Sequence, residues 1–165
     1  MTFLRDASGI ATAIIALSAG APSAVAQEIT FTMACQDLGS GAPEQLGDRN
    51  GHSIVVSQVS CHVDSGPMKG GVLSGADLWE MDNANGDMIS GSGVVRQPSG
   101  IAAYKTDEAK LTLTMTDGKV TGWTVSGKGR WPIATGTAAM MAGKSCTFTA
   151  QPTGAGQFAV ENKCN

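Results

Sequence analysis

The stretch KLTLTMTDGKVTGWTV, residues 110–125, has the pattern of two strands joined by a tight turn. Between Leu111 and Thr116 apolar residues alternate with threonines, which is the two-residue period of a strand with one buried face. Asp117 and Gly118 interrupt the alternation, and an Asp-Gly pair favours a type I′ turn, in which both residues need a positive φ. The stretch therefore predicts a β-hairpin.

A two-residue loop also predicts the register of this hairpin. The facing pairs would be Met115 with Val120, Leu113 with Gly122, and Leu111 with Thr124. This mostly apolar face is expected to point inward, whereas Trp123 and the intervening threonines would point outward. A glycine opposite Leu113 predicts a sharp bend or a close approach at that place in the sheet.

The composition favours an all-β protein of one domain. The chain has 165 residues, 22 of them glycine, and only 15% are charged, against about 25% in an average globular chain. The formal net charge is -3, and lysine and arginine form no cluster. A nucleic-acid partner is therefore not expected.

The N-terminal residues 1–26 have the layout of a secretory signal peptide. Arg5 precedes an apolar run over residues 10–19, and the small residues Ala24 and Ala26 stand just before Gln27. The apolar run is shorter than the roughly 20 residues that span a bilayer. We expect cleavage after Ala26, a periplasmic or extracellular location, no membrane span, and a single domain over residues 27–165.

Export changes the interpretation of the four cysteines, because an even number in an exported chain favours two disulfides. Residues 144–150 and 157–164 resemble two strands around a glycine-rich turn, and this places Cys146 opposite Cys164. We therefore prefer Cys146–Cys164 among the three possible pairings, which leaves Cys35–Cys61. A zinc site is the alternative, but the chain has no C-x-x-C pair and its thiols are widely spread.

Short strands separated by turns recur along the rest of the chain. Besides the hairpin, strands are predicted over 28–35, 52–63, 72–82, 88–96, 101–105, 144–150 and 157–163. Residues 36–51 are predicted as a long loop, Asp107 and Glu108 as a solvated turn, Pro132 as a strand end or edge, and 134–143 as a short helix or irregular strand. About eight strands at this spacing predict a single antiparallel meandering barrel, with a β-sandwich as the alternative.

Few residues are candidates for chemistry. His52 and His62 are predicted to be exposed at the ends of one strand, and no metal site, cofactor site or catalytic motif is indicated. A barrel of this size can hold one small ligand. Large amphipathic residues and one cation are the candidate ligand contacts: Trp79, Arg96, Tyr104, Trp123 and Trp131.

The segment Ala134-Thr135-Gly136-Thr137, close to Gly143-Lys144 and followed by two closing strands, resembles the allene oxide cyclase and dirigent-type barrels. The chain as a whole also resembles small exported proteins of Gram-negative bacteria that have no assigned activity. These resemblances imply a barrel, and they transfer no catalytic residue to this chain.

Three functions are compatible with these patterns. The first is a non-enzymatic exported barrel that binds a small apolar ligand or an envelope component. The second is a barrel-type cyclase or isomerase acting on an apolar substrate, and the third is a structural protein of the cell envelope. A cavity lined by tryptophan or tyrosine with a buried charge would favour the first two, whereas a filled interior would favour the third. An acid or histidine buried inside such a cavity would favour the enzyme. The oligomeric state is left open.

Overall fold

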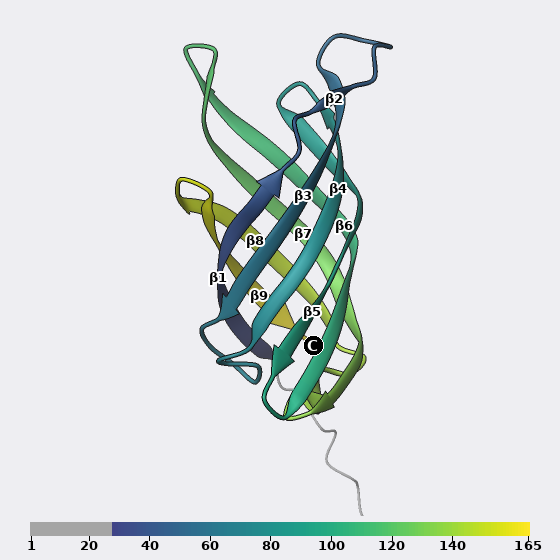
Figure 1. The fold of residues 1–165 in the computed structure, drawn as a ribbon, viewed down its shortest axis with the longest axis vertical. Coiled ribbons are helices and arrows are strands. Elements are labelled where there is room, and N and C mark those ends of the chain that lie inside the picture. Colours follow the sequence, from purple (N-terminus) through teal and green to yellow (C-terminus); the bar gives the residue numbers. More distant parts are fainter. Residues whose placement is uncertain (1–27) are drawn as a thin grey trace, which may run out of the picture.

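The computed structural model describes residues 28–165, and the predicted signal peptide over 1–26 lies outside them. The described chain forms a closed barrel of eight antiparallel strands, with one further short strand, β2, on the outside (Figure 1). The barrel strands are β1 (Ile29–Ser40), β3 (His52–Val63), β4 (Val72–Asp82), β5 (Asn85–Gln97), β6 (Gly100–Thr116), β7 (Lys119–Gly136), β8 (Ser145–Gly154) and β9 (Gln157–Cys164). The short strand β2 spans Glu44–Gln45, and the 3-10 turn η1 spans Ala139–Met141.

The barrel is a simple meander. From β3 to β9 each strand pairs with the next one in the chain, and β1 pairs with both β3 and β9 to close the cylinder. The predicted meandering barrel is confirmed, and the alternative of a two-sheet sandwich is wrong. Closure gives every barrel strand a partner on each side, which removes the exposed edges of an open sheet.

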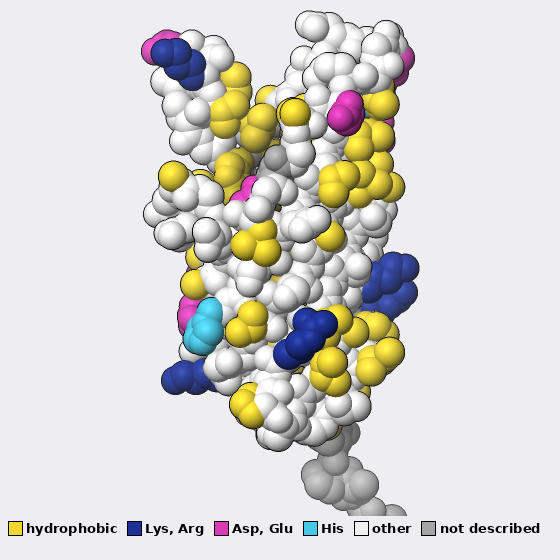
Figure 2. Space-filling model, in the orientation of Figure 1, with side chains coloured by type: hydrophobic (Ala, Val, Ile, Leu, Met, Phe, Trp, Pro, Cys, Tyr) yellow, Lys and Arg dark blue, Asp and Glu magenta, His cyan; other side chains and the backbone are white. Residues whose placement is uncertain are grey.

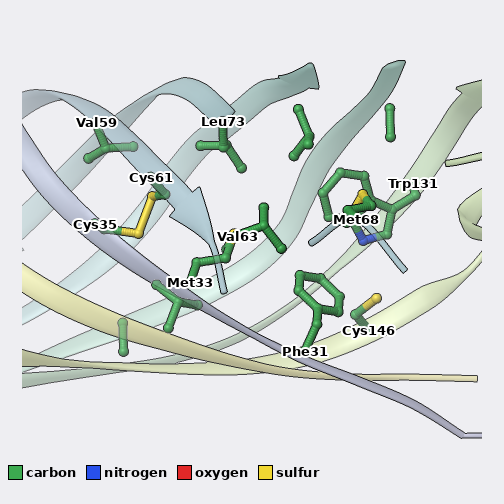
Figure 3. Close-up of a cluster of buried hydrophobic side chains, with 14 of the residues drawn as sticks. Phe31, Met33, Cys35, Val59, Cys61, Val63, Met68, Leu73, Trp131 and Cys146 are labelled. Carbon is green, nitrogen blue, oxygen red and sulfur yellow. A yellow bond between two sulfur atoms is a disulfide. The ribbon is translucent and has the colours of Figure 1, made fainter. Parts of the chain in front are cut away.

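One end of the barrel interior is solidly packed. There the β3–β4 loop places Met68 inside the barrel, and Met141 of η1 lies within the same end. Both side chains are completely buried, together with Phe31 and Val63. Figure 3 shows Met68 over the ring of Trp131, with Phe31 beside it, and the Phe31 and Trp131 ring centroids are 6.0 Å apart. This end, at the bottom of Figure 1, is therefore plugged by side chains.

Strands β6 and β7 are longer than predicted. Asp107 and Glu108 lie within β6 rather than in a turn, because register shifts in this region absorb the irregular spacing without ending the strand. Their exposed carboxylates pair with Arg130 at 3.3 Å and with Lys128 at 2.9 Å on β7. Pro132 also lies within β7, at a place where the pairing with β8 has already ended at Arg130, so its missing N–H interrupts no ladder.

The β6–β7 hairpin forms at the predicted turn but with a different register beyond it. Met115 pairs with Val120 as expected, but both side chains are exposed and do not point inward as predicted. A register shift then places Gly122 opposite Thr114 and Trp123 opposite Leu113. An extra residue in one strand of a pair moves every later side chain to the other face. The predicted outward position of Trp123 is therefore wrong, and this ring faces the interior.

Replacement of Gly118 by valine is expected to destabilise this hairpin. Asp117 has φ 50° and Gly118 has φ 72°, and a β-branched residue at positive φ is strained by about 1–2 kcal/mol. A Cβ at Gly118 meets no atom within 4 Å, so the expected loss comes from backbone strain and not from a clash of the Cβ. Urea unfolding measures the loss, with Lys119→Val at the next position as the control. Equal stability of the two variants would contradict the turn assignment.

Both predicted disulfides are present. Cys35 joins Cys61 across β1 and β3, and Cys146 joins Cys164 across β8 and β9. In each case the two cysteines are directly opposite in the strand register, and all four are buried. The first bridge therefore fastens the β1–β3 closure of the barrel, and the second fastens the last hairpin.

Candidate functional site: the barrel lumen

The other half of the interior is hollow. A cavity of about 350 Å³ lies inside the barrel, within the range of small-molecule sites. Its lining includes Asp37, Leu113 and Gln157 near the strand ends that carry the β4–β5, β6–β7 and β8–β9 turns. Figure 2 shows hydrophobic side chains in the hollow between the two projecting loops at the top of the molecule. The lumen is therefore open at the end opposite the plug.

The lining is strongly aromatic. All three tryptophans of the chain (Trp79, Trp123 and Trp131) and its single tyrosine, Tyr104, line the cavity. The ring centroids of Tyr104 and Trp131 are 5.6 Å apart, and the same distance separates Trp123 from Phe158. Such rings offer large, rigid apolar surfaces together with polar edges.

Of the predicted ligand contacts, Arg96 is not part of the cavity. Its side chain is exposed on the outer face of β5, because the preceding Val95 points into the interior and is completely buried. Successive side chains of a strand point to opposite faces. The structure thus brings Trp79, Tyr104, Trp123 and Trp131 together and leaves Arg96 outside.

A buried acid is the main feature that sequence reasoning missed. Asp77 follows the inward parity of Leu73 and Gly75 along β4, and it lines the cavity. Its Oδ1 atom is buried and has no hydrogen-bond partner among residues 28–165. Burial without a partner raises the pKa of this carboxyl from 3.8 to about 6.

Inward-facing glycines make room for Asp77 and its neighbours. A Cβ at Gly91 would lie 2.5 Å from Met88 Sδ, 2.8 Å from Asp77 Oδ1 and 3.0 Å from Thr106 Oγ1, so the two oxygens and the sulfur surround this glycine. A Cβ at Gly75 would lie 2.9 Å from the hydroxyl oxygen of Tyr104. Burial, and then the charge of Asp77, raise the pKa of Tyr104. We call Asp77, Tyr104 and Thr106 the lumen cluster.

The remaining charges of the lining are few. Asp37 lies near the open end, where its Oδ1 accepts a hydrogen bond from the Gly39 N–H at 3.0 Å. Arg130 borders the cavity, but its exposed side chain pairs with Asp107 at 3.3 Å. Within residues 28–165 no group of three or more histidine, cysteine or acidic side chains is arranged to hold a metal ion. The carboxyl groups therefore dominate the electrostatics of the lumen.

A second titratable group, His52, lies outside the lumen, near the open end of the barrel. The predicted long loop over 36–51 is shorter than expected, since β1 runs to Ser40 and β2 pairs with β3. We call residues 41–51 the strap.

His52, just after the strap, is buried rather than exposed as predicted. Its Nδ1 lies 2.5 Å from Asp48 Oδ1, and its Nε2 lies 2.7 Å from Glu80 Oε1. Both ring nitrogens are thus engaged by carboxylates, while His62 is exposed as expected.

The strap is expected to hold most firmly at mildly acidic pH. The hydrogen bonds to Asp48 and then Glu80 raise the pKa of His52 above its ordinary 6.5. The stabilisation of the strap by His52 is therefore complete below about pH 6.5, and it is lost as pH rises through the raised pKa of His52. The hydrogen bond from His52 lowers the pKa of Asp48. The stabilisation that the Asp48 carboxylate provides is therefore lost only in stronger acid.

Amide hydrogen exchange of residues 44–52, corrected for the intrinsic rate, measures this dependence. Protection should fall as pH rises above about 6.5 in the natural protein and should be independent of pH in His52→Gln. His62→Gln is the matched control, and it should leave the profile of the strap unchanged. Constant protection in the natural protein would contradict the assignment.

Comparison with known proteins adds no family to this description. No protein-family model matches the chain, and no curated protein matches it in a sequence search. The lumen itself is therefore the feature that bears on function.

Proposed function

We propose that this protein is an exported, non-enzymatic barrel that binds a small, mainly apolar ligand in its lumen. The observation that carries the proposal is the cavity of about 350 Å³, lined by all three tryptophans and the tyrosine, at the open end of a barrel whose other end is packed. A barrel that served only as a scaffold would gain stability from filling this space, because packing of apolar side chains stabilises a fold.

Export is supported by two observations. The two disulfides are typical of an oxidising compartment, and residues 1–26 have the sequence layout of a signal peptide. Within residues 28–165 no helix has the length and apolar character needed to cross a membrane. The disulfides and the signal-peptide layout support a periplasmic or extracellular location as part of the proposal.

The tryptophans allow a direct test of lumen binding. The neutral dye N-phenyl-1-naphthylamine absorbs the light that tryptophan emits, so its binding in the lumen should quench tryptophan emission and brighten the dye. Ala150→Phe places a ring in the cavity and should weaken dye binding at least tenfold. Gln151→Phe is the control, since Gln151 is exposed at the next position of β8. Absence of energy transfer in the natural protein would overturn the proposal.

A second candidate is a cyclase or isomerase acting on an apolar substrate, and Asp77 is the observation that favours it. A carboxyl group with a pKa of about 6 in an apolar cavity, next to the half-buried Tyr104, suits the transfer of a proton near neutral pH. Such an enzyme would exchange hydrogens of its substrate with solvent. Any compound that co-purifies with the protein can be incubated with it in deuterium oxide: deuterium uptake that is lost in Asp77→Asn would identify the enzyme, whereas an unlabelled compound would support the binding protein.

A further inference from the structure

The inference concerns the chemical class of the ligand and rests on the proposed lumen binding. We propose that the ligand is a small arylalkyl or alkyl amine whose protonated amino group pairs with Asp77 and whose apolar body lies against the aromatic lining. Three features of the lumen support this: the unpartnered oxygen of Asp77, the balance of charge around it, and the position of the aromatic rings.

The first feature is the unmet demand for a hydrogen-bond donor. Asp77 Oδ1 is buried, and no group within residues 28–165 donates to it. Asn162 Nδ2, on the same lining, is the buried donor without an acceptor in this part of the chain, so the polar part of a ligand can be satisfied at both places. A buried polar atom without a partner is unfavourable by an amount comparable to a lost hydrogen bond. Thr106 Oγ1, which lies near the same space beside Gly91, offers a second acceptor. An ammonium group has three donors and no acceptor, and it matches this pair of oxygens.

The second feature is the sign of the charge in the lumen. The titratable or charged side chains of the lining are Asp37 on β1, Asp77 on β4, Tyr104 on β6 and Arg130 on β7. Arg130 is exposed and pairs with Asp107, so it does not neutralise Asp77. A cation at the lumen cluster therefore meets the negative charge of Asp77, while an anion there is repelled. An ammonium group also favours the ionised form of Asp77 and would lower its pKa below about 6.

The third feature is the aromatic surface around the acid. Trp79 is the next inward-facing residue after Asp77 on β4, and Tyr104 is close enough for the charge of Asp77 to affect its pKa. Aromatic faces attract an ammonium group, more strongly when water is excluded. A buried cation requires such compensation, because its desolvation is unfavourable unless it is paired and hydrogen-bonded. Asp77 and the aromatic rings together supply this compensation.

The volume limits the size of the ligand. The cavity of about 350 Å³ equals the volume of about a dozen liquid water molecules. An amine with one aromatic ring and a short alkyl chain is of this size. Most of its surface would contact apolar side chains, since the lining is mainly aromatic and aliphatic.

A matched ligand series tests the inference. 4-Phenylbutylamine, 4-phenylbutanol and 5-phenylpentanoate share one phenylbutyl body and differ only in the head group, which is cationic, neutral and anionic at pH 7. Each is used to displace the neutral naphthylamine dye from the natural protein. We expect the amine to bind at least tenfold more tightly than the alcohol and the acid to bind more weakly than both.

Two variants separate the role of Asp77 from general effects. In Asp77→Asn the advantage of the amine over the alcohol should disappear, while the dye still binds and shows that the lumen is intact. Asp87→Asn, an exposed acid that pairs with Lys110 on the outside at 2.9 Å, should keep the full advantage. Dye binding with equal affinities for amine and alcohol, or an advantage that survives in Asp77→Asn, would overturn this inference and leave lumen binding standing. Failure of the dye to bind would overturn both.

Discussion

Asp77→Asn is expected to make the empty protein more stable at neutral pH by about 3 kcal/mol. Folding raises the pKa of the Asp77 carboxyl from 3.8 to about 6, and this difference corresponds to about 3 kcal/mol between the two protonation states. The folded protein thus holds the proton more tightly than the unfolded chain does. The stability of the natural protein should therefore fall as pH rises from about 4 to about 6 and stay lower above that range.

The variant removes this dependence, because asparagine resembles the neutral acid in shape and cannot ionise. Urea unfolding at pH 4 and pH 7 measures the effect: the two proteins should be nearly equal at the lower pH and differ by about 3 kcal/mol at the higher. Asp87→Asn is the control, since the exposed pair with Lys110 should contribute no more than about 1 kcal/mol. A loss of stability in Asp77→Asn at pH 7 would show that the carboxylate has a favourable partner inside the barrel.

Loss of both disulfides is the larger of the two expected effects. Cys35–Cys61 and Cys146–Cys164 span 26 and 18 positions of the chain. The entropy of the unfolded chain that each bridge removes corresponds to about 3–4 kcal/mol per bridge. The sum is a large part of the 5–15 kcal/mol by which domains are usually stable.

The two double variants Cys35→Ala/Cys61→Ala and Cys146→Ala/Cys164→Ala separate the contributions. Each should lower the free energy of unfolding in urea by about 3–4 kcal/mol, with the first slightly more affected because it closes the longer loop. Reductant should lower the midpoint of the natural protein and leave that of a variant lacking all four cysteines unchanged. An unchanged midpoint of the natural protein in reductant would contradict the pairing.

The fold and the disulfides follow from short-range patterns that the chain displays openly. Alternation around Asp117-Gly118 predicts the hairpin correctly, and the opposition of Cys146 and Cys164 follows from a single turn. A meander needs little more, because each strand pairs with its neighbour in the chain. Side-chain directions that depend on one extra residue cannot be predicted in this way. The register shift between Thr114 and Met115 turns Trp123 from the outer to the inner face, and no local pattern marks it.

The site could be predicted only in part, for a related reason. The inward face of β4 carries Gly75 and Asp77 between Leu73 and Trp79, and this mixture lacks the uniform apolar alternation by which a buried face is recognised. The inward parity of Asp77 with Leu73 and Trp79 is the signal that could have found the acid. His52 was misplaced because its burial comes from Asp48 and Glu80, and the second of these belongs to a different strand.

The packing of Met68, Met141 and Trp131 across one end makes the barrel a cup rather than a pipe. Whatever occupies it must arrive and depart over the same rim, so molecules exchange one at a time and never pass through. A guest anchored deep inside by its head would keep any long tail pointing outward into solvent. Ligands that differ only in tail length should then bind with similar strength once the tail extends past Asp37 and Gln157 near the rim.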